Sequence, residues 1–381
     1  EASKSAQIPR METFTLFVGQ KESGKSSLIT AFHNPSKDES PKPTTALEYL
    51  FARKSTSPNQ PKDVAHIWEL GGGSKLRKLV SVPITPESLP NVVAVIVVDL
   101  SKPIDLVPAL VEWIGIIKER VSECLIELQK TDEGAARALG EKAKGRMAAD
   151  HPDSSSVKPF AIPVIIIANK YDKFKSFESI QKKAISLALR FFAHLHSATL
   201  LSVALKDKSS QNQLRSILQH HLFVRNPSTK SKEPSVNFEK PMAVAAGTDS
   251  FDHILRSLPN GMSSSDFVDD RGRVSNDAGQ MWGRLLEELF ASEDCERYAH
   301  EISEDSKVDS EVFHEAIVDE MRAQCDQTLA TYKKEFQRRL RIEKGTGSKS
   351  SKSRSSKSKT SSSSSKASAS SSKTSSSSRR K

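Results

Sequence analysis

The order of apolar and polar positions divides the first 225 residues into alternating strands and helices. Nearly continuous apolar runs with the length of buried strands occur at 13–19, 64–70, 91–100, 160–170 and 198–205. Apolar residues spaced three and four apart predict helices between them, at about 25–33, 104–129, 177–195 and 210–222. Strands that alternate with helices form a parallel sheet covered on both faces. We therefore predict an α/β domain over residues 12–225, after a short N-terminal segment, 1–11.

The pattern weakens in two regions. Residues 130–158 are charged and rich in Ala and Ser, and we interpret them as a partly helical, poorly packed insertion between a helix and the next strand. Residues 226–308 combine Pro, Ser and Asp clusters with short apolar pieces, of which 281–290 fits an amphipathic helix. We predict that this second region is an irregular extension with short helices.

The last part of the chain changes character twice. Residues 309–344 are predicted to form one long helix with an apolar stripe of Phe313, Ile317, Met321, Cys325, Leu329, Tyr332, Phe336 and Leu340. The stripe is suited to packing against its own domain or a large partner, to a partner's groove, or to self-association, and all three stay open. Residues 345–381 are Ser/Lys repeats, which predicts a disordered tail.

Charge is concentrated in that tail. The chain has 57 Lys and Arg, 47 Asp and Glu, and a formal net charge of +10. Ten of the basic residues and no acid lie in 345–381, so the rest is close to neutral. The tail could contact acidic tubulin tails, anionic membrane or nucleic acid without specificity. It has no interleaved aromatic residues, so specific nucleic-acid recognition is not predicted.

Cysteine usage and hydropathy bound the setting of the protein. The cysteines Cys124, Cys295 and Cys325 are far apart and follow no metal or disulfide spacing, which favours a reducing, intracellular compartment. No run of about 18 apolar residues is present, so no membrane span is predicted.

The strongest motif is GQKESGKS, which follows the first strand and opens the first helix. This context is the one that a phosphate-binding loop requires. Backbone amides at the helix start would bind phosphate oxygens, Lys25 would reach the β- and γ-phosphates, and Ser26 would hold Mg²⁺. The predicted phosphate-binding residues are Gly19, Glu22, Ser23, Gly24, Lys25, Ser26, Ser27 and Gly72.

A second motif, NKYD at 169–172, ends the fourth apolar run. In P-loop proteins that bind guanine, Asp172 would accept hydrogen bonds from guanine N1 and N2, and Lys170 would lie along the base. Downstream, Ser202 would brace a second base-contacting loop, and the adjacent Val203 would supply a backbone amide for the guanine oxygen. We predict a guanine site made of Asn169, Lys170, Asp172, Ser202 and Val203.

The switch segments both resemble and depart from working GTPases. Thr44, with Thr45 as the alternative, is placed to close over Mg²⁺, together with Ser26 and Glu69. Hydrolysis needs a residue that positions the attacking water, and Gly73 stands where a glutamine is usual. Lys21 would crowd an arginine finger from an activating protein. We predict slow or absent hydrolysis and no catalytic residue.

The motifs GQKESGKSSL, KPTTALEY, KDVAHIWELGGG, VVDLSKP and VDEMRAQCDQTLATYKKEFQRR resemble the dynein light intermediate chain family, in particular its dynein 2 branch. The resemblance spans about residues 12–340. It implies a Ras-like P-loop domain with a mostly parallel sheet, a helical C-terminal extension and a disordered tail. It also implies a non-catalytic subunit that docks on and stabilises the dynein 2 heavy chain and functions with the other dynein 2 subunits.

The same resemblance implies a setting and partners. It points to retrograde intraflagellar transport and cilium assembly, with location in the cytoplasm, the cilium and the cytoskeleton. Partners would be the intraflagellar transport machinery and, through the motor, microtubules. GTP or GDP with Mg²⁺ is a possible cofactor. The alternative is an active Ras- or Rab-like GTPase, which predicts Asp at position 69, Gln at position 73 and often a prenylated terminal Cys; the chain ends SSRRK. A P-loop kinase or ATPase is disfavoured by NKYD.

Overall fold

The computed structural model describes residues 10–34, 41–55, 61–224, 235–259, 263–269, 273–290 and 316–346. The chain divides into two units, 1–300 and 301–381, which are treated separately below. The predicted N-terminal segment up to residue 9, parts of the 226–308 extension, the start of the 309–344 helix and the tail from residue 347 lie outside the described residues.

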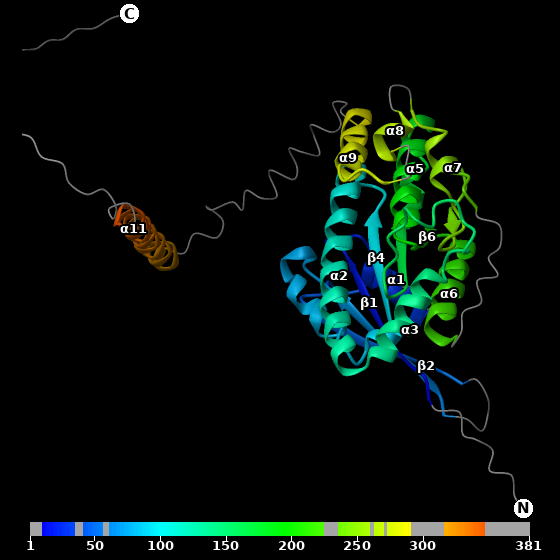
Figure 1. Cartoon of the computed structure of the whole chain (residues 1–381), viewed down its shortest axis with the longest axis horizontal. Helices are drawn as coiled ribbons and strands as arrows, with labels where there is room; N and C mark the ends of the chain where they lie inside the picture. The colour runs from blue at the N-terminus through cyan, green and yellow to red at the C-terminus, as the bar shows by residue number, and fades with distance from the viewer. Residues whose placement is uncertain are drawn as a thin grey trace, which may run out of the picture. The chain divides into compact units, whose positions relative to one another are not determined.

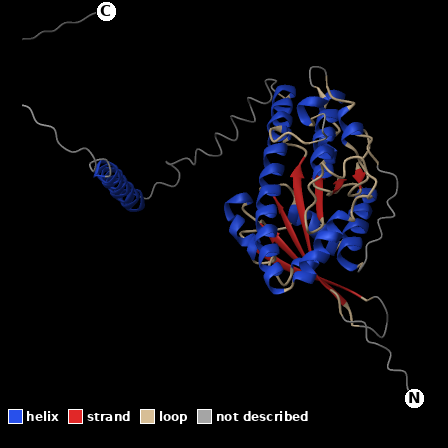
Figure 2. Ribbon diagram, viewed as in Figure 1, coloured by secondary structure: helices blue, strands red, loops and turns tan. Residues whose placement is uncertain are grey.

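Seven strands of the first unit form one sheet in the order β2-β3-β1-β4-β5-β6-β7 (Figure 2). The inner strands are parallel, and the two edge strands, β2 and β7, are antiparallel to their neighbours. The prediction of a mostly parallel α/β sheet is confirmed. The strands are β1 (Glu12–Gly19), β2 (Leu47–Lys54), β3 (Asp63–Leu70), β4 (Val92–Asp99), β5 (Val164–Asn169), β6 (Thr199–Ser202) and β7 (Ala243–Val244).

Helices cover both faces of this sheet (Figure 1). The α-helices of the unit are α1 (Lys25–His33), α2 (Pro103–Thr131), α3 (Glu133–Lys144), α4 (Tyr171–Phe174), α5 (Ser179–Leu195), α6 (Lys208–Phe223), α7 (Phe251–Leu255), α8 (Ser264–Phe267) and α9 (Ala278–Leu289). Two 3₁₀ segments, η1 (Gly73–Ser81) and η2 (Leu89–Asn91), precede β4. The core on one face includes α2, α5, α7 and α9, and the core on the other includes α1 and α6.

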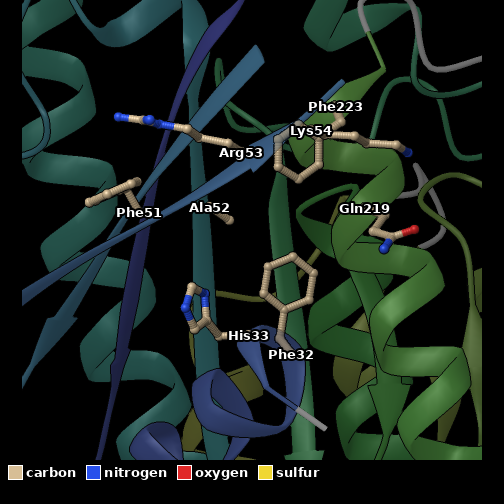
Figure 3. Close-up of a pocket in the computed structure, with 8 residues that line it drawn as sticks. All are labelled: Phe32, His33, Phe51, Ala52, Arg53, Lys54, Gln219 and Phe223. Carbon is tan, nitrogen blue, oxygen red and sulfur yellow. The ribbon is translucent and has the colours of Figure 1, made fainter. Parts of the chain in front are cut away.

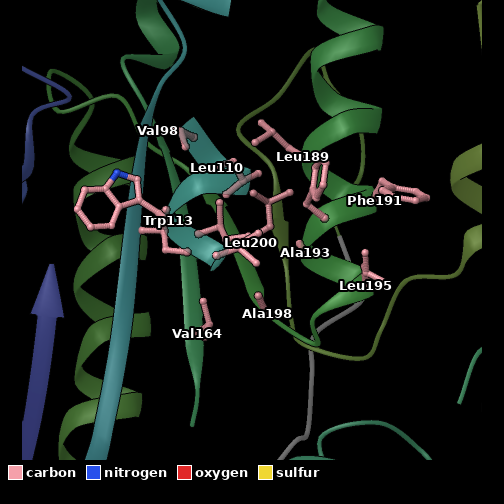
Figure 4. Close-up of a cluster of buried hydrophobic side chains, with 14 of the residues drawn as sticks. Val98, Leu110, Trp113, Val164, Leu189, Phe191, Ala193, Leu195, Ala198 and Leu200 are labelled. Atoms are coloured by element: carbon pink, nitrogen blue, oxygen red, sulfur yellow. The ribbon is translucent and has the colours of Figure 1, made fainter. Parts of the chain in front are cut away.

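Strand β4 shows why its first seven residues are all apolar. All eight of its residues are buried. Ala94, Ile96 and Val98 belong to the core under α2 and α5, whereas the alternate Val95 and Val97 belong to the core under α1 and α6. A strand with successive side chains on opposite faces needs apolar residues at every position when both faces are covered. Figure 4 shows the first of these cores.

The segment 130–158 is better packed than its composition predicted. It contains α3, and Leu139 of that helix and Met147 after it are buried in the larger core. Arg146 donates hydrogen bonds to the carbonyl oxygens of Phe160 and Ala161, at 2.6 and 3.0 Å. The prediction of poor packing was therefore wrong, because a few well-placed apolar residues and the half-buried Arg146 side chain fix the segment.

The described part of the 226–308 extension also packs onto the domain. Trp282 of α9 is fully buried in the core that α2 and α5 share. Arg190 of α5 pairs with Asp249 through two 2.7 Å contacts, and both side chains are almost completely buried. The extension thus completes one face of the domain.

The second unit contains the helix α11 (Ala316–Thr346). Of the predicted stripe, Met321, Leu329 and Tyr332 are 61%, 55% and 70% exposed. Among the described residues, no helix is long and apolar enough to cross a membrane.

Candidate nucleotide-binding site

The loop between β1 and α1 has the backbone of a phosphate-binding turn. Gly19 has φ +149°, and a Cβ there would lie 2.2 Å from the carbonyl oxygen of Val97 on β4. Gly24 has φ +89°, and a Cβ there would lie 2.2 Å from Asn169 Nδ2. Both positions therefore require glycine. The loop leads into the N-terminus of α1, where backbone amides favour the binding of anions.

Three further residues of the predicted phosphate site differ in exposure. Glu22 adopts a left-handed conformation, φ +65°, with an exposed side chain 3.7 Å from Lys21 Nζ. Ser23 is buried, and its carbonyl oxygen accepts a 2.8 Å bond from Asn169 Nδ2. Ser27, in the first turn of α1, is half-buried. Asn169 thus ties the guanine motif to the phosphate loop.

Lys25 lies over the loop that it follows. Its Nζ donates to the carbonyl oxygens of Gly19 at 3.3 Å and Gln20 at 2.8 Å. Burial lowers the pKa of Lys25, and the nearby Glu69 carboxylate counteracts that shift. A buried ammonium held by carbonyl oxygens is suited to meeting phosphate charge.

The three residues predicted to hold Mg²⁺ meet at one point. Ser26 Oγ donates to Glu69 Oε1 at 2.6 Å and lies 3.4 Å from Thr44 Oγ1. They come from α1, from β3 and from the loop before β2. Burial raises the pKa of Glu69, while the Ser26 hydrogen bond and the Lys25 charge counteract that rise. Three side-chain oxygen atoms in a small cluster fit the preference of Mg²⁺ for oxygen ligands, and such an ion would bridge the protein to a phosphate.

The three glycines after β3 have different structural roles, which the sequence alone does not show. Gly71, which sequence reasoning missed, donates its amide to Ala46 at 2.6 Å. A Cβ on Gly71 would come within 2.3 Å of the Thr44 carbonyl oxygen, so this glycine lets the Thr44 loop approach β3. Gly72 and Gly73 have φ +70° and +64°. A Cβ on Gly73 would point toward the Lys21 amide, 3.9 Å away, so the position that lacks a glutamine faces the phosphate loop.

The guanine side is only partly as predicted. Lys170, at φ +62°, places its Nζ 2.6 Å from Asp99 Oδ2, and Asp99 is buried at the end of β4. Asp99 was missed, although the acid in VVDLSKP marks the end of a central strand beside Asn169. Asp172 is exposed at the start of α4.

The second base-contacting segment departs from its predicted role. The Val203 amide, predicted to face the guanine oxygen, donates to the Ala168 carbonyl at 2.8 Å. Ser202 is fully buried, and its Oγ has no hydrogen-bond partner among the described residues, so it does not brace the loop by a hydrogen bond. The arrangement therefore brings the predicted phosphate and metal residues together, and the predicted guanine side rests on Asn169, Lys170 and Asp172.

Comparison with known proteins gives the family. The family model described as "Dynein light intermediate chain (DLIC)" matches residues 2–144. Cytoplasmic dynein 2 light intermediate chain 1 of Homo sapiens is 35% identical over 325 residues, which are 85% of this chain and 88% of that protein. The same protein of Bos taurus is 36% identical over 85% of this chain and 88% of its own.

A solved structure supports the fold. The crystal structure of the conserved domain of a dynein light intermediate chain superposes with a TM-score of 0.54 and 18% identity, over 75% of this chain and 100% of that one. Together with the sequence matches along most of the chain, these findings show that the protein belongs to the dynein light intermediate chain family.

Proposed function

We propose that this chain is a light intermediate chain subunit of a dynein 2 motor. It docks on the heavy chain, stabilises it, and takes part in retrograde intraflagellar transport and cilium assembly. The observation that supports this most is the 35–36% identity to dynein 2 light intermediate chains over almost the whole of both chains. Its setting is the cytoplasm and the cilium.

The test is copurification from ciliated cells. The tagged full chain should recover the dynein 2 heavy chain and carry it in a stable, stoichiometric complex. The Lys25→Ala variant, which loses the cation of the phosphate loop, should recover the heavy chain equally well if docking does not depend on nucleotide. Recovery of the intact chain without any dynein heavy chain overturns the proposal.

We further propose that the pocket binds GTP or GDP with Mg²⁺ and hydrolyses GTP slowly. Ser26, Thr44 and Glu69 lie where a Mg²⁺ ion would be held, and Lys25 lies where phosphate would bind. In contrast, Gly73 has no side chain to position water, and the exposed Lys21 occupies the rim of the loop. The cluster of Ser26, Thr44, Glu69 and Lys25 supports nucleotide binding, and the glycine at position 73 supports slow hydrolysis.

Single-turnover GTP hydrolysis measures this directly. The expected rate is at or below about 10⁻⁴ s⁻¹, the scale of an unassisted Ras-like site, and it should not rise in the assembled motor. The Lys25→Ala variant should lose bound nucleotide from the purified sample. A rate that reaches the order of 1 s⁻¹ with dynein subunits present would mean that the chain is an active switch, since that is the scale of assisted hydrolysis.

A further inference from the structure

Strand β2 is an edge strand with an unusually apolar centre. It is the first strand in the sheet order, and in the described part of the chain it pairs only with β3. Tyr49, Leu50 and Phe51 are 46%, 39% and 46% exposed. Edge strands normally carry charge or are covered, because an open row of amides and carbonyls recruits another strand. The four central residues, Tyr-Leu-Phe-Ala, carry no charge.

Both faces of β2 carry apolar side chains at the centre of the strand. On one face, Tyr49 packs on Trp68 of β3 with ring centroids 4.7 Å apart, and Arg53 lies 4.9 Å from the centre of the Phe51 ring. The other face borders an open hollow of about 370 Å³ beside Phe32 and Phe223. Figure 3 shows this hollow, which is lined by the C-terminal half of β2 together with Phe32 and Phe223.

Charges occur only near the ends of β2, and they have opposite sign. Glu48 lies at the start of the strand, and Arg53 and Lys54 lie at its end; all three are exposed. A strand with this order is complementary to itself when two copies run antiparallel. Cross-strand pairs of opposite charge and of aromatic residues are the pairs that stabilise such a ladder.

The hydrogen-bond pattern restricts the possible registers. Alternate residues of an edge strand direct their backbone N–H and C=O groups away from the sheet. When two copies of the strand pair antiparallel about a two-fold axis, each of these residues must lie opposite another of them, and the residue on the axis lies opposite its own copy. Centring on Phe51 places Glu48 opposite Lys54 and Tyr49 opposite Arg53, each twice by symmetry. Centring on Leu50 instead places Glu48 opposite Ala52 and leaves the charges unpaired. The Phe51 register is the one that satisfies every position.

We propose that β2 pairs with β2 of a second copy of this chain, antiparallel and centred on Phe51. The two seven-stranded sheets then form one continuous sheet across the two-fold axis. The interface is isologous, and it covers the exposed Tyr49, Leu50 and Phe51 of both copies.

Sedimentation of the purified full chain tests the pairing. The wild-type chain should self-associate at concentrations up to about 100 μM, the range of a modest interface. Glu48→Lys places two lysines opposite each other and should weaken association at least about tenfold. Adding Lys54→Glu reverses the pair and should restore it. Glu119→Lys, which makes the same charge reversal at an exposed position of α2, is the matched control and should change nothing.

A crosslink fixes the register. Phe51→Cys, in a background with Cys295 and Cys325 replaced by Ser, should form a disulfide between copies when a mild oxidant is added. Residues directly opposite in an antiparallel ladder have Cα atoms about 4.5–5.5 Å apart, which is within the range that a disulfide spans. Arg53→Cys should not, because the two copies of that position lie about 13 Å apart along the strands. A monomer at every concentration overturns the proposal. So does a dimer that Glu48→Lys leaves intact, which would place the contact elsewhere, for example on α11.

Discussion

At the scale of single residues, the phosphate loop carries a conformation that its residue does not favour. Glu22 sits at φ +65°, where a Cβ meets the backbone, and its side chain is exposed with one weak charge contact. An L-residue in this region costs about 1–2 kcal/mol. An exposed ion pair at 3.7 Å offsets little of that cost. The position therefore holds strain that a glycine would release.

Glu22→Gly is expected to raise the free energy of unfolding by about 0.5–1 kcal/mol, the released strain less the entropy that glycine adds to the unfolded chain. Urea unfolding followed by circular dichroism measures the change. Glu22→Ala removes the same charge but keeps the Cβ, so it should give no such gain. Equal stabilisation by both variants would assign the effect to charge instead of backbone conformation.

At the scale of elements, the features that could be predicted from the sequence were those that depend on one continuous segment of the chain. Buried parallel strands are mostly apolar, so β1, β3, β4 and β5 were recognisable as runs. The loop from Gly19 to Ser26 was predicted for the same reason, since its glycines and its helix start are adjacent in the chain. The apolar runs did not predict strand β2, because its exposed residues form no buried run.

Contacts between distant segments were not predictable in this way. The Asp99–Lys170 pair joins residues that only the β4–β5 register brings together. The hydrogen bond from the Val203 amide to the Ala168 carbonyl oxygen likewise depends on the register between β6 and β5. Gly71 escaped notice because its role is defined by the Thr44 loop, which lies far from it in sequence. Pairings of this kind follow from topology, which a single sequence pattern leaves open.

At the scale of the whole first unit, segments that looked peripheral are part of the core. The described extension reaches α5 through Arg190–Asp249, and the 130–158 segment is joined to α5 through Asp153, which lies 2.9 Å from His194 Nε2. Histidines are therefore buried where these segments meet. His196, just after α5, is buried, and its Nδ1 lies 3.2 Å from the Lys158 carbonyl oxygen.

The burial of His196 makes the stability of this unit depend on pH. Desolvation lowers the pKa of His196 to about 4, and the nearby charges of Lys118 and Lys158 act in the same direction. The folded state then keeps the ring neutral, while the unfolded chain takes up a proton near pH 6.5. The stabilisation from keeping this ring neutral is complete above about pH 6.5. It is lost as the pH falls toward 4, which lowers the free energy of unfolding by up to about 3 kcal/mol.

Urea unfolding at a series of pH values between 7.5 and 4 measures this loss. His196→Asn keeps a donor for the Lys158 carbonyl oxygen but cannot titrate, so its stability should fall less steeply than that of the wild type over the same interval. The difference between the two slopes isolates His196 from the carboxylates, which titrate in both proteins. Parallel slopes would show that His196 is protonated in the folded chain without cost, and that the loop after α5 opens to water when it is.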